Sequence, residues 1–247
     1  QQGRPGPIVI EVTKETAESR CDFFSPEKPP QMGVPAADSA HILLLESNFP
    51  ILFVGAEDLS LSASIALTKW SEQSGIPVIT TYRAKGMLSE QHPNSIGSCG
   101  LSPVVDQLQQ KFLQRADLLI TVGLDPVELR PNWLPGWPST MKVLNISSTG
   151  QPDLVTEFTL DLRGDIAEII KRCSTVSSSK WIPTEFIEHR QQIEAIFNDG
   201  PYGPASMIQT LQQALPDNTV ISLDVGARSV RSFSIRSFPK KTQSIRP

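Results

Sequence analysis

Short apolar runs alternate with helix-like segments through the middle of the chain. The runs are Ile51–Val54, Pro77–Thr81, Asp117–Gly123, Met141–Ile146 and Phe158–Leu162. Strands that are apolar on both faces are typical of a parallel sheet covered by helices on each side. The pattern therefore predicts an α/β fold, a doubly wound parallel sheet of Rossmann-like type, over about residues 34–176.

The segments between and after these runs carry helical spacing. Gly75 is predicted to end the first helix, and Asp165 with Glu168 to begin the third in the manner of a capping box. A second helix is expected over Ser102–Arg115. The apolar stripes are Ala63, Ala66, Leu67 and Trp70, then Val104, Val105, Leu108 and Phe112, then Ile166, Ile169, Ile170 and Cys173.

The flanks differ from this central part. Ile8–Val12 is predicted to be a strand, and the proline-rich stretch after it a surface linker, so residues 1–33 form no unit of their own. Residues 177–200 are expected to hold a linker helix. Pro204 is expected to open another helix, after which Thr219–Leu223 forms a strand that begins a further α/β unit in residues 201–247.

Composition narrows the functional classes. The formal net charge is −4 and no run approaches 18 apolar residues, so neither nucleic acid nor a membrane is an expected partner. The last segment, 227–247, carries six Lys or Arg and no acid. Its mixed composition favours a solvated, disordered tail over a binding surface. Three widely spaced cysteines without a CxxC pair predict neither a zinc site nor a disulfide framework, and they suit the cytoplasm.

Several residues have both a functional and a structural interpretation. The glycines at strand ends (Gly55, Gly97, Gly100, Gly123) are able to cradle a phosphate, but no GxGxxG follows a strand, so plain turns are favoured. Asp125 and Glu128 follow the third strand, where carboxylates serve acid–base work or mark the start of a helix. The second interpretation is favoured.

The histidines and tryptophans are treated in the same way. His92 is interpreted as a solvated loop residue, His41 as part of the linker and His189 as part of a charged helix face. Trp133 and Trp137 lie in a proline-rich loop that either lines a pocket mouth or packs against a neighbouring domain.

Six pieces of the chain, in order, resemble the thiamine diphosphate-dependent family that includes acetolactate synthase and benzoylformate decarboxylase. They are Gly3–Val12, Pro50–Gly55, Gly75–Thr81, Lys85-Gly86 with His92-Pro93, Ala116–Gly123, and Leu215–Asp217 through Asp224-Val225-Gly226. The resemblance implies the end of a pyrimidine-binding domain (1–33), a central Rossmann-like domain (34–176), a linker helix (177–200) and the start of a diphosphate-binding domain (201–247).

The resemblance also implies chemistry. Such enzymes decarboxylate or join 2-oxo acids with thiamine diphosphate and Mg²⁺, so Asp224, Val225 and Gly226 are the candidate cofactor contacts, with no catalytic or metal-binding residue assigned. The family's activating Glu and its Gly-Asp-Gly metal motif have no counterpart in these residues, and Ser229–Pro247 departs from the family. FAD is not expected, because Leu124–Leu129 and Cys99–Ser102 replace the segments that acetolactate synthases place at the flavin.

The functional prediction is a truncated member of this family that is not catalytic alone. It would associate with itself or with a complementary chain, and the complete enzyme would act on a small 2-oxo acid. A stand-alone nucleotide-binding or helper module is the alternative, and a non-functional fragment with unpaired strand edges is a third possibility.

Overall fold

The computed structural model describes residues 11–19, 38–129, 133, 137–138, 140–148, 157–174, 179–197, 200 and 202–216. The predicted strand Thr219–Leu223, the candidate contacts Asp224, Val225 and Gly226, and the basic tail lie outside the described residues, as does most of Ile8–Val12.

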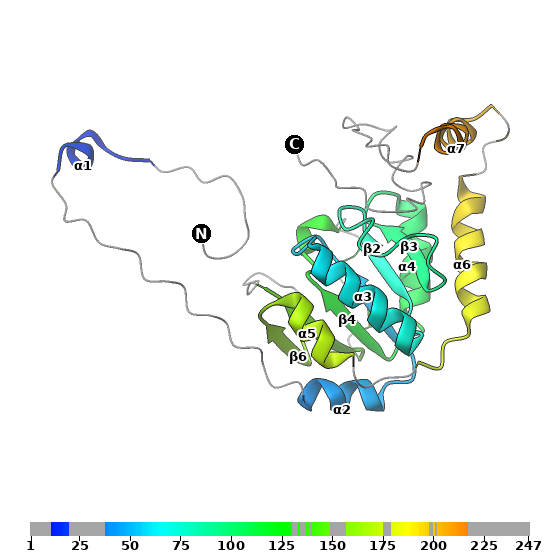
Figure 1. Ribbon diagram of the computed structural model, residues 1–247, viewed down its shortest axis with the longest axis horizontal. Coiled ribbons are helices and arrows are strands. Elements are labelled where there is room, and N and C mark those ends of the chain that lie inside the picture. Colours follow the sequence, from blue (N-terminus) through cyan, green and yellow to red (C-terminus); the bar gives the residue numbers. More distant parts are fainter. Residues whose placement is uncertain are drawn as a thin grey trace.

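A six-stranded parallel sheet forms the centre of the molecule (Figure 1). Its strands are β1 (Pro50–Val54), β2 (Val78–Thr81), β3 (Ser95–Cys99), β4 (Leu118–Val122), β5 (Lys142–Ser147) and β6 (Leu160–Arg163). Their order, β3-β2-β1-β4-β5-β6, is that of doubly wound nucleotide-binding folds, with the switch point between β1 and β4. The predicted fold class is confirmed, with β3 as one strand more than expected.

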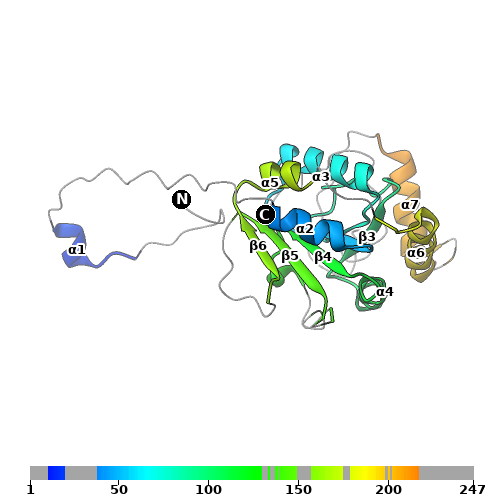
Figure 2. The ribbon, with the colours of Figure 1, turned by 90° about the horizontal axis from the view of Figure 1, so that it is seen from below.

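Helices cover both faces of this sheet. Figure 2 shows α3 and α5 on one face and α4 on the other. The helices are α1 (Lys14–Glu18), α2 (Asp38–Glu46), α3 (Leu61–Ser74), α4 (Pro103–Leu113), α5 (Ile166–Cys173), α6 (Pro183–Ile196) and α7 (Pro204–Ala214), with a 3-10 turn η1 at Pro126–Glu128. The sequence pattern indicated neither α1 nor α2. None of the helices in the described ranges is both long and apolar enough to cross a bilayer.

The first core lies between the sheet and α2, α3 and α5. Every residue of the predicted stripes of α3 and α5 is buried there. Gly75 ends α3 as predicted, with a φ of 69° that glycine adopts without strain. Asp165 begins α5 by accepting a hydrogen bond from the Glu168 amide at 2.9 Å, which confirms this helix start.

On the other face, the predicted stripe of α4 is partly wrong. Val104 is 52% exposed, whereas Asp106 and Gln109 are completely buried. The Asp106 carboxylate accepts a hydrogen bond from the Gly100 amide at 2.8 Å, and the Gln109 side chain donates to the Ile96 carbonyl at 2.8 Å. Two polar residues therefore face inward because the backbone around β3 provides their partners.

Helix α6 completes the second core. Trp181, just before it, stacks on Phe112 of α4 with the ring centroids 4.9 Å apart, and its indole nitrogen donates to the Pro50 carbonyl at 2.8 Å. Phe186 and Ile193 of α6 are buried. The helix predicted in residues 177–200 is confirmed, and it packs directly against the central sheet.

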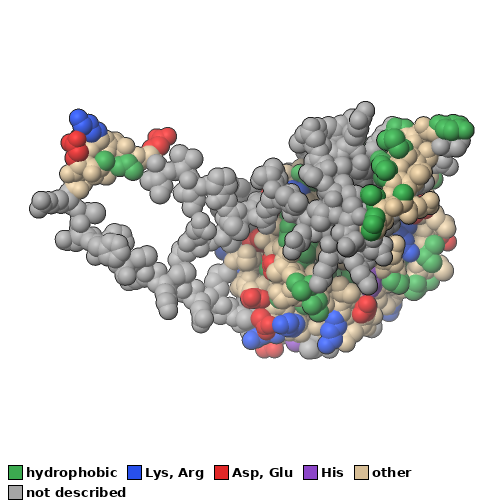
Figure 3. Space-filling model, turned by 45° about the horizontal axis from the view of Figure 1, so that its top comes forward, with side chains coloured by type: hydrophobic (Ala, Val, Ile, Leu, Met, Phe, Trp, Pro, Cys, Tyr) green, Lys and Arg blue, Asp and Glu red, His purple; other side chains and the backbone are tan. Residues whose placement is uncertain are grey.

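Helix α7 follows α6 and was also predicted. Its apolar side chains are largely uncovered, with Met207 and Leu211 more than half exposed and the preceding Tyr202 99% exposed. Figure 3 shows hydrophobic side chains along this helix at the upper right.

Candidate functional site

The carboxyl edge of the sheet at the β1–β4 switch point is where ligands bind in this fold. Three segments meet there: the turn from β1 into α3, the segment from β4 through η1, and the end of β5. In dinucleotide-binding members of the fold, free amides of the first turn and the N-terminus of the first helix hold a pyrophosphate. Whether this site can hold a pyrophosphate therefore depends on whether the backbone amides after β1 are already hydrogen-bonded within the protein.

Two glycines bring the segments after β1 and β4 into backbone contact. A β-carbon at Gly55 would lie 2.4 Å from the Gly123 carbonyl oxygen, which only glycine avoids. Gly123 has a φ of 56°. The turn interpretation of these two glycines is confirmed, because each serves close approach of the chain to itself.

The amides after β1 are bound within the protein. Gly55 donates to the Val122 carbonyl at 2.9 Å and Glu57 to the Gly123 carbonyl at 3.0 Å. Between them, the Ala56 amide donates to Oε1 of Glu128 at 3.1 Å. The start of α3 is capped as well, since the Ser60 hydroxyl accepts from the Ala63 amide.

Glu128 joins the ends of two neighbouring strands. Its second carboxylate oxygen accepts a hydrogen bond from the Thr81 hydroxyl at the end of β2. The side chain is 1% exposed, so a buried acidic group lies against the first turn. Neither sequence interpretation of Glu128 anticipated this contact, although its position after the third predicted strand pointed to the correct edge.

Asp125 follows the helix-start interpretation. Its carboxylate accepts from the Val127 amide at 3.0 Å and its carbonyl from the Glu128 amide at 2.9 Å. These bonds form the η1 turn and direct Glu128 toward β1 and β2.

A phosphate at this turn would have to displace Glu128. The displaced carboxylate would lose its donors while surrounded by protein, and leaving a buried charge uncompensated costs about 3–5 kcal/mol. Glu57 and Asp58 add two more acidic side chains to the same turn. The described residues therefore do not fit a dinucleotide pyrophosphate here.

Cys99 ends β3 at the same edge. Burial, together with the nearby carboxylates of Asp106 and Glu128, raises the pKa of the Cys99 thiol well above its ordinary value. A thiol kept protonated in this way is a poor nucleophile, so Cys99 is a packing residue.

His92 and His41 have structural contacts. His92 Nδ1 accepts from the Asn94 amide at 3.2 Å, which leaves Nε2 to donate to Glu72, 3.4 Å away. His41 Nε2 lies 2.9 Å from the Arg172 carbonyl and joins α2 to α5. His92 thus fastens its loop to α3 and is not simply solvated.

The interpretation of His189 as part of a charged face is wrong, because it is 5% exposed. Its Nε2 lies 3.1 Å from Oε1 of Gln109. Burial, with a smaller contribution from the positive charge of Arg115, lowers the pKa of His189 from 6.5 to about 4. The imidazole is therefore neutral at neutral pH.

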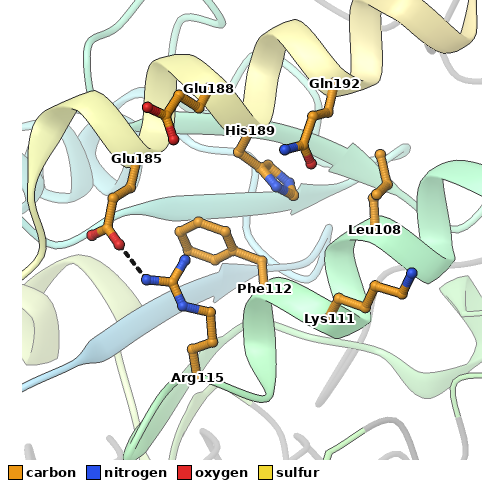
Figure 4. Close-up of a pocket in the computed structure, with 8 residues that line it drawn as sticks. All are labelled: Leu108, Lys111, Phe112, Arg115, Glu185, Glu188, His189 and Gln192. Carbon is orange, nitrogen blue, oxygen red and sulfur yellow. Dashed lines mark hydrogen bonds and ion pairs between the residues drawn. The ribbon is translucent and has the colours of Figure 1, made fainter.

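His189 lines a pocket of about 180 Å³ between α4 and α6 (Figure 4). Arg115 pairs with Glu185 across it, and its guanidinium carbon lies 5.0 Å from the Trp181 ring centroid. These contacts join the two helices. We therefore interpret the pocket as part of the helix packing. The lining residues are Leu108, Lys111, Phe112, Arg115, Glu185, Glu188, His189 and Gln192.

Trp133 fits neither interpretation given to it. It is completely buried and its ring centroid lies 5.5 Å from that of Phe53, so it belongs to the core of the central domain. Trp137 packs against the same core cluster.

Among the described residues no group of three or more His, Cys, Asp or Glu side chains is placed to hold a metal ion. This part of the chain therefore does not fit a magnesium-bound diphosphate. Asp224, Val225 and Gly226, the candidate cofactor contacts, lie outside it.

Residues 37–172 match the family model described as "Thiamine pyrophosphate enzyme, central domain". The chain belongs to this family. The matched residues include all six strands of the sheet, helices α2 to α4, and α5 up to its last residue but one.

The relatives of this chain carry one activity in their names. An acetolactate synthase large subunit of Corynebacterium glutamicum is 23% identical over 258 residues, covering 96% of this chain and 41% of that protein. A probable acetolactate synthase large subunit of Methanococcus aeolicus is 25% identical over 260 residues, covering 92% and 43%. An acetolactate synthase of Mycobacterium bovis is 30% identical over 132 residues, covering 49% and 21%. The chain thus spans about two fifths of the first two relatives.

The similarity extends beyond the central domain. The C. glutamicum match leaves only 4% of the chain uncovered. The segment before residue 37 and the segment after residue 172 are each longer than that. The match therefore reaches into both flanks and includes part of Ser229–Pro247, which corrects the expectation that this tail departs wholly from the family.

Proposed function

We propose that these residues form the supporting central part of a thiamine diphosphate-dependent 2-oxo-acid decarboxylase or carboligase of the acetolactate synthase type. A polypeptide of these 247 residues alone does not catalyse. The observation that carries the proposal is the filled switch point, where Glu128 and neighbouring backbone groups bind the turn amides that a nucleotide cofactor would use. The site favours a support role over a stand-alone nucleotide-binding module.

The proposed division follows the resemblance. Residues 34–176 support flanking domains that hold thiamine diphosphate and Mg²⁺, and Asp224, Val225 and Gly226 contact the cofactor only when the diphosphate-binding domain is complete. FAD is not part of the proposal. Because two relatives are named large subunits, we propose that the chain associates with further copies of itself or with a complementary chain. The three widely spaced cysteines suit the cytoplasm, where we propose that the protein acts.

Titration calorimetry with thiamine diphosphate and magnesium chloride tests whether this polypeptide binds the cofactor. We expect no saturable heat, because the described residues provide no metal cluster and the amides of Gly55, Ala56 and Glu57 after β1 already donate within the protein. Saturable binding at micromolar concentration would contradict the proposal and make Asp224–Gly226 functional in this chain.

Domain substitution tests the support role directly. In the acetolactate synthase of C. glutamicum, the central domain and the helix that follows it would be replaced by residues 34–200 of this chain, and acetolactate formation from pyruvate would be measured. We expect activity in the soluble hybrid and none in the separate 247-residue polypeptide. A correctly assembled hybrid that binds the cofactor but forms no acetolactate would count against the proposal.

A further inference from the structure

The contact between Glu128 and the first turn resembles ligand binding more than ordinary packing. The Ala56 amide, which lies in the turn where this fold binds phosphate, donates to the carboxylate at 3.1 Å. The Thr81 hydroxyl donates to the other oxygen. A main-chain amide and a hydroxyl from two adjacent strand ends are the donors that an anion of carboxylate or phosphate type requires.

The segment from β4 through η1 fixes the position of the Glu128 carboxylate. Asp125 closes the η1 turn that directs Glu128 inward. A β-carbon at Gly100 would lie 2.7 Å from the Glu128 carbonyl oxygen, so the backbone of this segment also rests on the end of β3. The segment thus reaches the ends of β1, β2 and β3, which form the half of the sheet on one side of the switch point.

We infer that Glu128 is a built-in anion that occupies the phosphate position of the first turn and closes this position to anionic cofactors. The inference does not depend on the proposed support role, because it concerns only whether the turn is an anion site filled by the chain's own carboxylate. The ligand class is a small carboxylate or phosphate group.

Chemical rescue tests the inference in the full chain. Glu128→Ala removes the carboxylate, and the melting temperature is measured with sodium acetate, with acetamide and with sodium chloride at equal concentrations. We expect Glu128→Ala to melt several degrees lower, roughly 5 °C, because buried donors lose their acceptor. Acetate should recover part of this loss, whereas acetamide and chloride should not. Leu124→Ala, which truncates another buried side chain of the segment, is the matched control and should show no acetate effect.

Glu128→Gln covers the case in which Glu128→Ala does not fold. It preserves the shape and one acceptor but removes the charge, so we expect a melting temperature below that of the unaltered chain. The unaltered chain should show no saturable binding of pyrophosphate by calorimetry. The inference is overturned if Glu128→Gln is as stable as the original chain, if acetamide rescues Glu128→Ala as well as acetate, or if pyrophosphate binds the unaltered chain and Glu128→Ala abolishes that binding.

Discussion

At the scale of single residues, several carboxylates stabilise the fold by accepting hydrogen bonds from backbone amides of other segments. A carboxylate has several acceptor positions and no donor, so it suits strand and helix ends, where amides lack partners. Asp106, Asp117, Glu128 and Asp165 all act in this way. Asp117 accepts from the Ser47 hydroxyl and from the amides of Asn48 and Phe49, and so joins the start of β4 to the residues before β1.

Asp117→Asn is expected to lower stability in a pH-dependent manner. Burial acts to raise the pKa of Asp117, but hydrogen bonds from the Ser47 hydroxyl and from the amides of Asn48 and Phe49 outweigh it and lower the pKa. A lowered carboxyl pKa stabilises the fold above the ordinary pKa and loses this effect as the pH falls below about 4. Urea denaturation should show a loss of roughly 1 kcal/mol at neutral pH that shrinks in acid.

The matched control is Glu168→Gln, which removes an exposed carboxylate paired with Lys171. Water and salt screen an exposed pair of this kind, so this variant should stay close to the original in stability. A constant difference between Asp117→Asn and the original across the pH range would contradict the role given to the Asp117 charge.

At the scale of elements, the predictions succeeded where local pattern and tertiary packing agree. Helices α3 and α5 bury the apolar residues that their helical spacing predicted, because these helices pack against apolar strands. β3 was missed because Ser95–Cys99 is mostly small and polar and gains its strand form from pairing with β2. The same neighbour explains α4, whose buried Asp106 and Gln109 bind backbone groups at β3. Glu128 was placed at the correct edge, but nothing local indicated that the Ala56 amide would be its partner.

The docking of α6 predicts a stability change in mild acid. His189 has a pKa lowered to about 4, so below pH 6.5 the unfolded chain takes up a proton that the folded chain does not. Stability should therefore fall by up to about 1.4 kcal/mol per pH unit between pH 6.5 and 5. Four charged residues line the same pocket: Lys111 of α4, Arg115 just after α4, and Glu185 and Glu188 of α6. The positive charge of Arg115 strengthens this trend.

His189→Gln should reduce this pH dependence, at the expense of lower stability at neutral pH. Urea denaturation at several pH values measures both effects. His92→Gln serves as the control, because the His92 ring contacts Glu72 of α3 and only its backbone carbonyl contacts α6. An unaltered slope in His189→Gln would show that another group titrates in this window.

At the scale of the whole molecule, α6 belongs physically with the sheet. Trp181, Phe186 and Ile193 are part of or adjoin the second core. Arg190 donates to the carbonyls of His92, Pro93 and Ser95 at 3.2, 2.9 and 2.7 Å. A segment interpreted from sequence as a linker thus covers one face of the sheet beside α4. The unit that folds independently is therefore expected to extend to about residue 200.

Two fragments test this boundary. Residues 34–200 should unfold cooperatively in urea, whereas residues 34–176 lose the burial of Trp181 and Phe186, worth about 2–3 kcal/mol each. Together with the lost polar contacts this approaches the 5–15 kcal/mol of a whole domain. The shorter fragment should therefore unfold at a much lower urea concentration, with a weaker near-ultraviolet signal from Trp70 and Trp133. Equal midpoints would show that α6 packs on a domain that is already complete, and would restore it to the role of a linker.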